Sequence, residues 1–205
     1  MLCAVLIPSR ARPERLVKTL ISIRDTVAAA DQVETLIRID DDDQASLAIK
    51  DELARRFKHT RVVVGPRETG YTSLAKFYTQ LADASQAAWI FNLNDDATFQ
   101  GHGWDLQLAA LPTTGVIVQP EWITSGSVRG SVYRNVEGGP FPCVPNGCWR
   151  PDFAVMLEPQ DTWLDDELRK RRGWSTRFLK GLYVHHARDR DEVLAVHRQL
   201  DSNKT

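Results

Sequence analysis

The stretch that most constrains the fold is residues 89–96, a short apolar run that ends in two acids. Its sequence, Trp-Ile-Phe-Asn-Leu-Asn-Asp-Asp, predicts a buried β-strand over residues 89–93 followed by a polar turn. Carboxylates at the end of a buried strand are costly unless hydrogen bonds or a cation satisfy them. In an open α/β sheet that end is also where ligands bind. Asp95 and Asp96 therefore indicate either a ligand site or an acidic surface turn.

This strand is the fourth in a series of strand–helix units. Continuous apolar runs predict strands, and apolar residues at helical spacing predict the helices between them. The expected strands are residues 3–7, 34–39, 60–64 and 89–93, and the expected helices are residues 13–23, 44–57 and 71–84. This order predicts an α/β fold with a mostly parallel, right-handed central sheet flanked by helices. Neither a Gly-x-Gly-x-x-Gly motif after the first strand nor a Walker A motif is present.

The second half of the chain is less regular. The expected elements are a short helix ending at residue 111, a strand over 116–119, a weak hairpin within 126–147, an extended element over 148–156, a helix over 161–173, a strand over 174–184 and a terminal helix after residue 188. The helix over 161–173 begins with acids and ends with bases, an order that complements the helix dipole without any function.

Composition sets broad limits on the class of protein. The chain has 205 residues, 42% hydrophobic and 26% charged, which predicts one globular domain over residues 1–205. The formal charge of −1 gives no electrostatic reason to expect nucleic acid or an anionic membrane as a partner. No apolar run approaches the roughly 20 residues that span a bilayer, and the apolar N-terminus is too short for a secretory signal. With three cysteines, an odd count that indicates reduced thiols, we expect a cytoplasmic protein.

Polar side chains follow the first predicted strand. Ser9, Arg10 and Arg12 lie in the loop after it, where they could meet phosphates or a base. Two solvated arginines would explain the same sequence.

Four acids, residues 40–43, follow the second predicted strand and repel one another. Their carboxylates could accept hydrogen bonds from a base or ribose, or cap the next helix. Capping explains Asp42 or Asp43, and Asp40, nearest the strand, is the better ligand candidate. Lys76, near the N-terminus of the next expected helix, is a candidate for a diphosphate, although a surface lysine is common there.

Two histidines, His185 and His186, end the last predicted strand. Adjacent residues on a strand face opposite sides of the sheet, so at most one of them points into a given site.

Taken in order, these features resemble the GT-A glycosyltransferases, in particular the large inverting group typified by family two. The resemblance covers roughly residues 4–188 and consists of several weak matches in the right order. Asn94-Asp95-Asp96 resembles their Asp-x-Asp motif with Asn94 in place of the first acid, and Trp104 resembles the tryptophan that follows it. The other matching residues are Pro8, Ser9 and Arg10 in the nucleotide loop, Asp40 at the second strand, Asp165 and Asp166 on the acidic helix, and His185 and His186.

The resemblance implies a nucleotide-sugar donor, UDP- or GDP-linked, and a divalent cation, Mn²⁺ or Mg²⁺. The residues expected at the nucleotide sugar are Pro8, Ser9, Arg10, Arg12, Asp40, Asp42, Lys76, Asn94 and Asp95. The residues expected at the metal are Asp95, Asp96, His185 and His186. The cation would neutralise the leaving diphosphate.

The resemblance also implies a catalytic base that takes the proton of an acceptor hydroxyl as it attacks, with inversion at the sugar. Aligning the acidic helices places Asp165 in that role, with Asp166 as the close alternative. Residues 1–100 would form the nucleotide-sugar-binding half, and residues 101–205 a small acceptor-side half. The acceptor could be a small molecule, a glycan, a protein or a modified DNA base.

Two other functions fit parts of the sequence. A sugar nucleotidyltransferase would normally carry a glycine-rich loop after the first strand, and the loop at residues 8–13 has no glycine. A catalytically degenerate GT-A-like binding domain is the second alternative, which Asn94 supports.

Overall fold

The structure is a computed structural model of the whole chain. It describes residues 1–68, 71–125, 132–134, 137, 139–148 and 164–186. The terminal helix expected after residue 188 and most of the extended element expected over 148–156 lie outside the described residues.

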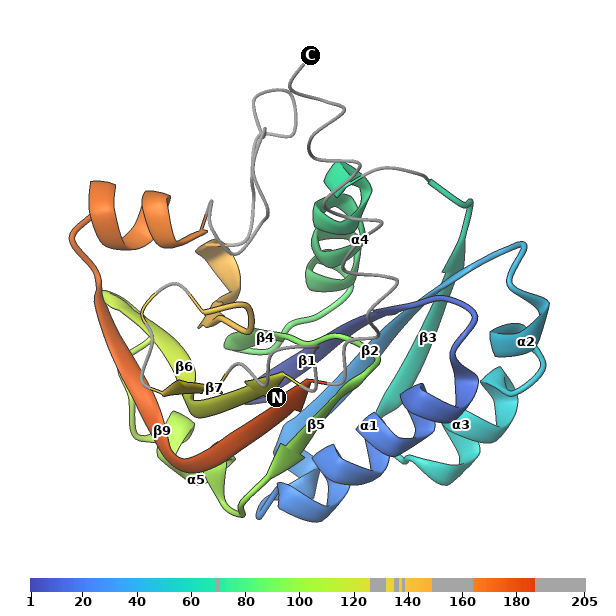
Figure 1. Cartoon of the computed structure of the whole chain (residues 1–205), viewed down its shortest axis with the longest axis horizontal. Helices are drawn as coiled ribbons and strands as arrows, with labels where there is room; N and C mark the ends of the chain where they lie inside the picture. The colour runs from blue at the N-terminus through green and yellow to red at the C-terminus, as the bar shows by residue number, and fades with distance from the viewer. Residues whose placement is uncertain (69–70, 126–131, 135–136, 138, 149–163, 187–205) are drawn as a thin grey trace.

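One mixed sheet forms the centre of the molecule, in the order β3-β2-β1-β4-β8-β6-β9-β5, with β7 on β6 (Figure 1). The strands are β1 Cys3–Ser9, β2 Val33–Asp40, β3 Thr60–Gly65, β4 Trp89–Asn92, β5 Ala97–Gln100, β6 Val116–Ser125, β7 Val132–Arg134, β8 Cys143–Pro145 and β9 Ser175–His186. The four predicted N-terminal strands pair in parallel, β1 with β2 and β4, and β2 with β3. The expected α/β fold is confirmed.

The second half of the sheet is more varied than a parallel series. Strand β8 runs antiparallel to β4 and β6, and β5 runs antiparallel to β9, whereas β6 and β9 are parallel. As a result, β9 ends at the same edge of the sheet as the carboxyl ends of β1, β2 and β4.

Helices cover both faces of the sheet. They are α1 Pro13–Thr26, α2 Gln44–Leu47, α3 Lys50–Arg56, α4 Tyr71–Asp83, α5 Trp104–Ala109 and the π-helical turn η3 Asp165–Arg171, with short 3₁₀ turns η1 Ala30–Gln32 and η2 Asn146–Cys148. None of the helices in the described part of the chain has the length and apolar character needed to cross a membrane.

The helix expected over residues 44–57 is broken into α2 and α3. Leu47 and Ile49 both pack against the core cluster, although two residues apart on one helix point to nearly opposite sides. A break between them lets both side chains reach the core, which a continuous helix would not allow.

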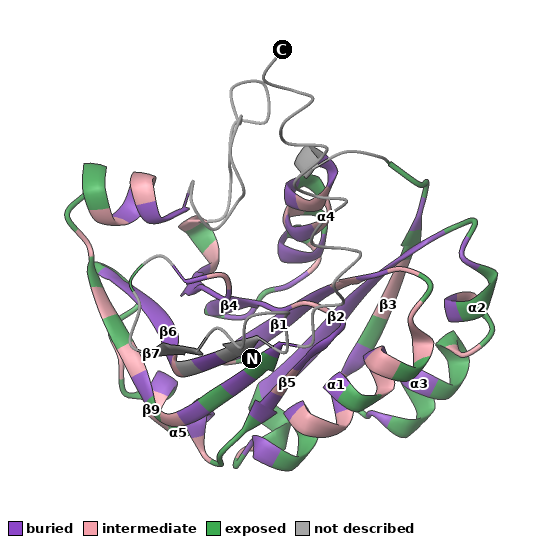
Figure 2. Ribbon diagram, in the orientation of Figure 1, coloured by how far each residue is buried: buried purple, intermediate pink, exposed green. Residues whose placement is uncertain are grey.

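The hydrophobic core occupies both faces of the sheet. Leu16 of α1 and Leu108 of α5 belong to one buried cluster. Tyr78 of α4, with Leu164 and Leu168 at η3, belongs to the other. Figure 2 shows the central strands almost wholly buried and the outer surfaces of α1 and α3 exposed. Burial on both faces is what continuous apolar strands predict.

Strand β5 was not predicted from the sequence. It is only four residues long, and its partner residues on β9 lie 83 to 89 positions later, with Ala97 opposite His186. Phe99 of β5 packs at ring-centroid distances of 5.1 Å from Phe91 and 5.4 Å from Trp104, so β5 is held by tertiary packing.

We predict that Gly101 is required for the approach of β5 to β9. Gly101 has φ 106°, and a Cβ there would lie 1.9 Å from the Gly181 carbonyl oxygen. Gly103 also has positive φ, at 76°, but its Cβ would meet nothing within 4 Å. Gly101→Ala should cost about 3 kcal/mol or more of unfolding free energy, and Gly103→Ala about 1 kcal/mol. Urea denaturation of both variants measures this, and equal losses would contradict it.

Candidate functional site

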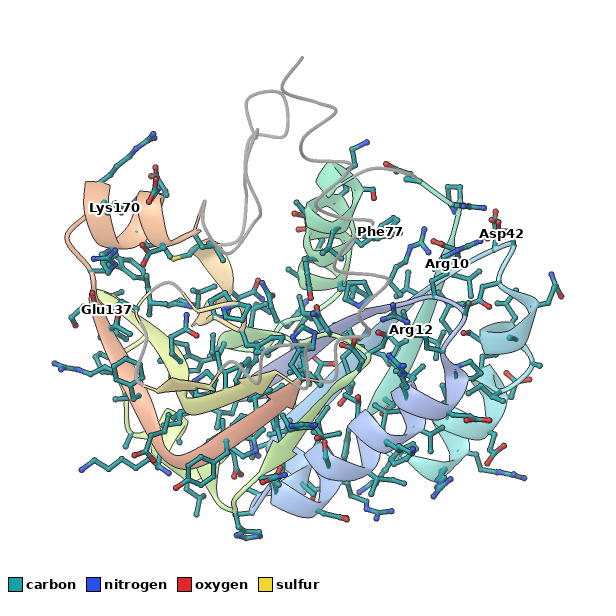
Figure 3. All side chains as sticks on the ribbon, in the orientation of Figure 1. Arg10, Arg12, Asp42, Phe77, Glu137 and Lys170 are labelled. Carbon is teal, nitrogen blue, oxygen red and sulfur yellow. The ribbon has the colours of Figure 1, made fainter. Side chains whose placement is uncertain are left out.

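Polar side chains from distant parts of the chain meet at the carboxyl ends of the parallel strands. Ser9 ends β1, Asp40 ends β2, and Asp95 and Asp96 follow β4, while His186 ends β9. Figure 3 shows Arg10, Arg12 and Asp42 close together at this edge of the sheet. This is the edge at which ligands bind in open α/β sheets.

Asp95 is buried and held by the loop after β1. The Ser9 hydroxyl donates to its Oδ2 at 2.8 Å, and Arg12 Nη1 donates to its Oδ1 at 3.2 Å. The Thr19 hydroxyl donates to its backbone carbonyl at 3.0 Å. Burial raises the pKa of Asp95 even though Arg12 and Ser9 favour its ionised form. Asp95 is therefore anchored to β1 and α1.

Asp96 lies beside His186, with 3.0 Å between Oδ1 and the imidazole Nε2. Arg12 and Arg15 place their Nη1 atoms 3.5 and 3.9 Å from its Oδ2. Burial opposes ionisation of Asp96, but the contact with His186 and the charges of the two arginines outweigh it, so the pKa of Asp96 is lowered.

His186 and His185 face opposite sides of β9, as adjacent strand residues must. His186 is 3% exposed, and His185 is exposed. The Asn94 amide nitrogen lies 3.1 Å from His186 Nε2, and the Tyr78 hydroxyl donates to Leu93 O at 3.0 Å. Asn94 and Asp96 therefore both approach the same imidazole.

A second charge cluster joins the loops after β1 and β2. Arg10 Nη1 donates to Asp40 at 2.8 Å, and Arg10 holds both oxygens of Asp42, at 2.5 and 3.1 Å. These contacts raise the pKa of Arg10 and lower that of Asp42. Buried Arg38 donates to the other oxygen of Asp40 at 2.9 Å and stacks 4.4 Å from the Phe77 ring centroid.

Three further residues were named from the sequence: Pro8 and Lys76, expected at the nucleotide sugar, and Asp43, expected as a helix cap. Pro8 lies within β1 and pairs in register with Arg38. Asp43 caps α2, accepting from Ser46 N at 3.2 Å, so capping explains Asp43 as expected. The Lys76 ammonium lies 2.8 Å from Glu68 Oε2 at the surface, where the pair is worth little.

The two predicted base residues lie on η3 and are paired within that helix. Arg169 donates to both oxygens of Asp165, at 2.6 and 2.7 Å, and also contacts Glu137 at 3.2 Å. Asp166 pairs with Lys170 and is the more exposed, at 35% against 11% for Asp165.

The donor set around Asp96 fits a divalent cation in part. Within the described ranges, no group of three or more His, Cys, Asp and Glu side chains could hold a metal. Asp96 and His186 nevertheless converge on one point, and Asn94 supplies an amide oxygen if its amide is turned over. Two oxygens and one imidazole nitrogen suit Mn²⁺, and ligand oxygens could complete its coordination.

Three residues at this site were missed from the sequence, and two of them, Arg38 and Arg15, carried a signal. Arg38 is a charge inside an apolar strand, two positions before Asp40 and so on the same face. Arg15 is a base in the first turn of α1, the wrong end of the helix dipole. Tyr78 lies on the apolar face of α4, and only the structure shows where its hydroxyl points.

Comparison with known proteins identifies the fold. No protein-family model matches the chain, and no curated protein matches its sequence. Solved structures match it along most of its length. TarS 1-349 of S. aureus in complex with UDP has a TM-score of 0.69 and 11% identity, covering 98% of this chain and 64% of that one. The chain has the GT-A fold.

Two further matches extend the comparison. GalNAc-T7 with UDP, GalNAc and Mn²⁺ has a TM-score of 0.71 at 11% identity, covering 93% of this chain and 44% of that one. Mannosyltransferase PcManGT from Pyrobaculum calidifontis, in complex with GDP-Man and Mn²⁺, has 0.66 at 11% identity, covering 90% and 56%. The chain spans less than two thirds of the length of each of these GT-A proteins, and identity this low establishes the fold alone.

We predict that the two neighbouring carboxylates have different pH dependences in chelator-treated protein. The pKa of Asp96 is lowered on folding, so ionised Asp96 contributes stability that is complete above its unfolded pKa of about 3.9 and is lost below it. The pKa of Asp95 is raised, so its ionisation costs stability, increasingly as pH rises above about 4.

Urea denaturation of Asp95→Asn and Asp96→Asn between about pH 4.5 and pH 7 measures this difference. The unfolding free energy of the wild type minus that of the variant should fall with rising pH for Asp95→Asn and stay level for Asp96→Asn. The same trend in both variants would show that the two carboxylates titrate alike.

Proposed function

We propose that this protein is a glycosyltransferase that moves a sugar from a nucleotide-diphosphate donor to an acceptor hydroxyl. The observation that carries the proposal is the 3.0 Å approach of His186 to Asp96, two residues 90 positions apart, at the ligand-binding edge of a GT-A fold. The matched proteins bind UDP, UDP-GlcNAc or GDP-Man, two of them with Mn²⁺, which supports a nucleotide sugar and a divalent cation here.

We assign the metal to Asp96 and His186, with Asn94 as a weaker third ligand. When bound, the cation would neutralise charge on the leaving diphosphate. Asp95 is anchored by Ser9 and Arg12, which favours a role in shaping the donor site over direct ligation. His185 faces away and is the less suitable ligand.

The nucleoside of a UDP- or GDP-sugar would lie beside Arg10, Asp40 and Asp42. This cluster offers both donors and acceptors at the ends of β1 and β2, as a base and ribose require. Lys76 would have to leave Glu68 to reach a phosphate, and Pro8 shapes the loop. The nucleotide half remains residues 1–100 in this proposal, and the acceptor half residues 101–205.

The acceptor side would use Asp165 or Asp166 as general base in a single inverting displacement. Both oxygens of Asp165 accept hydrogen bonds from Arg169, so an acceptor hydroxyl would have to displace that guanidinium group to reach the carboxylate. Asp166 is less buried and has one cationic neighbour, Lys170.

The three cysteines are free thiols, which supports a reducing, cytoplasmic setting.

We predict that His186→Ala lowers Mn²⁺-dependent binding of UDP or GDP by about tenfold or more, because it removes one of two strong metal ligands. His185→Ala, one residue away on the other face, is the matched control and should bind as the wild type does. Calorimetry with and without Mn²⁺ measures this. Equal behaviour of the two variants would remove His186 from the metal site.

We predict that loss of the catalytic base lowers kcat by about 10²-fold or more while donor affinity is kept. Asp165→Asn and Asp166→Asn identify which carboxylate acts, and Glu167→Gln, on the same helix and paired with Arg171, is the control. The rate of donor hydrolysis or transfer is measured through the release of UDP or GDP. Full turnover in both Asp variants would refute this assignment.

The alternative of a catalytically degenerate binding domain is favoured by one feature, the amide of Asn94 at the position of an acid. Such a domain would bind UDP or GDP with Mn²⁺ and release no sugar from the donor. The hydrolysis assay separates the two functions.

A further inference from the structure

We propose that Arg12 and Arg15 are counter-ions of the Asp95–Asp96 pair that couple metal binding to diphosphate binding. The inference rests on the proposed function, because it concerns the same donor site. It adds a role for Arg15. Both arginines would repel a cation that binds alone and would attract the diphosphate of the nucleotide.

The positions of these arginines are unusual for their helix. Arg12 immediately precedes α1, and Arg15 lies in its first turn. The N-terminus of a helix carries partial positive charge and disfavours bases. Both guanidinium groups instead lie against the acids after β4: Arg12 3.2 Å from Asp95 and 3.5 Å from Asp96, and Arg15 3.9 Å from Asp96. The acids compensate for what the helix dipole costs.

The order of burial places the arginines on the open side of the acids. The side chains of Arg12 and Arg15 are 30% and 33% exposed, whereas those of Asp95 and Asp96 are 7% and 4% exposed. A diphosphate that arrives from solvent therefore meets guanidinium groups first, and a cation that arrives alone meets like charge. Guanidinium groups bind phosphate oxygens well, since their N–H groups form a planar fork.

The formal charges of these four side chains, two carboxylates and two guanidinium groups, sum to zero. A divalent cation bound alone would therefore add positive charge beside two guanidinium groups. Removing one guanidinium within several ångströms of the cation should tighten metal binding by roughly tenfold in this partly buried site. A diphosphate offsets the cation and gives the arginines a new partner. Because coupling is reciprocal, metal and nucleotide should each strengthen the other's binding.

The test uses the full chain and Arg12→Gln, Arg15→Gln and Arg12→Lys. MnCl₂ is titrated calorimetrically into each protein alone and with saturating UDP or GDP, whichever binds the wild type more tightly. Arg24→Gln is the matched control, since Arg24 lies on the same helix but pairs with exposed Asp25.

The expected result has opposite signs for the two ligands. The Gln variants should bind Mn²⁺ alone about tenfold more tightly and the nucleotide about tenfold more weakly, so that coupling falls. Arg12→Lys should keep most of the coupling, and Arg24→Gln all of it. A misfolded variant would lose the assembled site and with it the nucleotide coupling, so tighter Mn²⁺ binding with some coupling retained distinguishes the proposed effect from misfolding.

Two outcomes overturn the inference and are distinguishable. If the Gln variants match the wild type in both titrations, the arginines play no such role, and the proposed function stands. If the wild type binds neither UDP nor GDP with Mn²⁺ present, the proposed function fails and the inference fails with it.

Discussion

The burial of two adjacent carboxylates at the end of β4 is the constraint on which the site depends. Asp95 and Asp96 are both buried, and buried charges are costly unless they are paired or hydrogen-bonded. Groups from three elements offset that cost by contacting the carboxylates. They are the hydroxyl of Ser9 at the end of β1, the arginines at the start of α1, and His186 at the end of β9. The same contacts fix the positions of three elements around one point.

A second constraint is the path of the chain that brings His186 there. Strand β9 pairs in parallel with β6 and antiparallel with β5, and β5 begins directly after the acids. Ala97 opposite His186 sets the register, so the imidazole reaches Asp96 because the sheet pairing places it there. The packing of Phe99 against Phe91 and Trp104 stabilises that short strand. The aromatic core therefore supports the geometry of the site.

The charge cluster at the ends of β1 and β2 has a different design, in which two arginines share one carboxylate. Asp40 accepts hydrogen bonds from Arg10 and from Arg38. The Arg38 guanidinium group also donates to the Pro66 carbonyl and stacks on the Phe77 ring. One end of this network, at Arg38 and Asp40, is buried. The other end, at Arg10 and Asp42, is open to solvent and can exchange partners with a ligand. Arg10, like Arg12 and Arg15 at the other cluster, is more exposed than the buried carboxylate that it contacts.

The sequence by itself determined the strand–helix order, the acidic strand end at Asp95 and Asp96, and that only one of two adjacent histidines could face a site. Those features follow from local rules of hydrophobicity and side-chain period. Only the tertiary structure decided that His186 meets Asp96, that β5 exists, and that Arg12 and Arg15 neutralise the acids. These depend on pairings between residues some 80 to 90 positions apart, which local pattern does not encode.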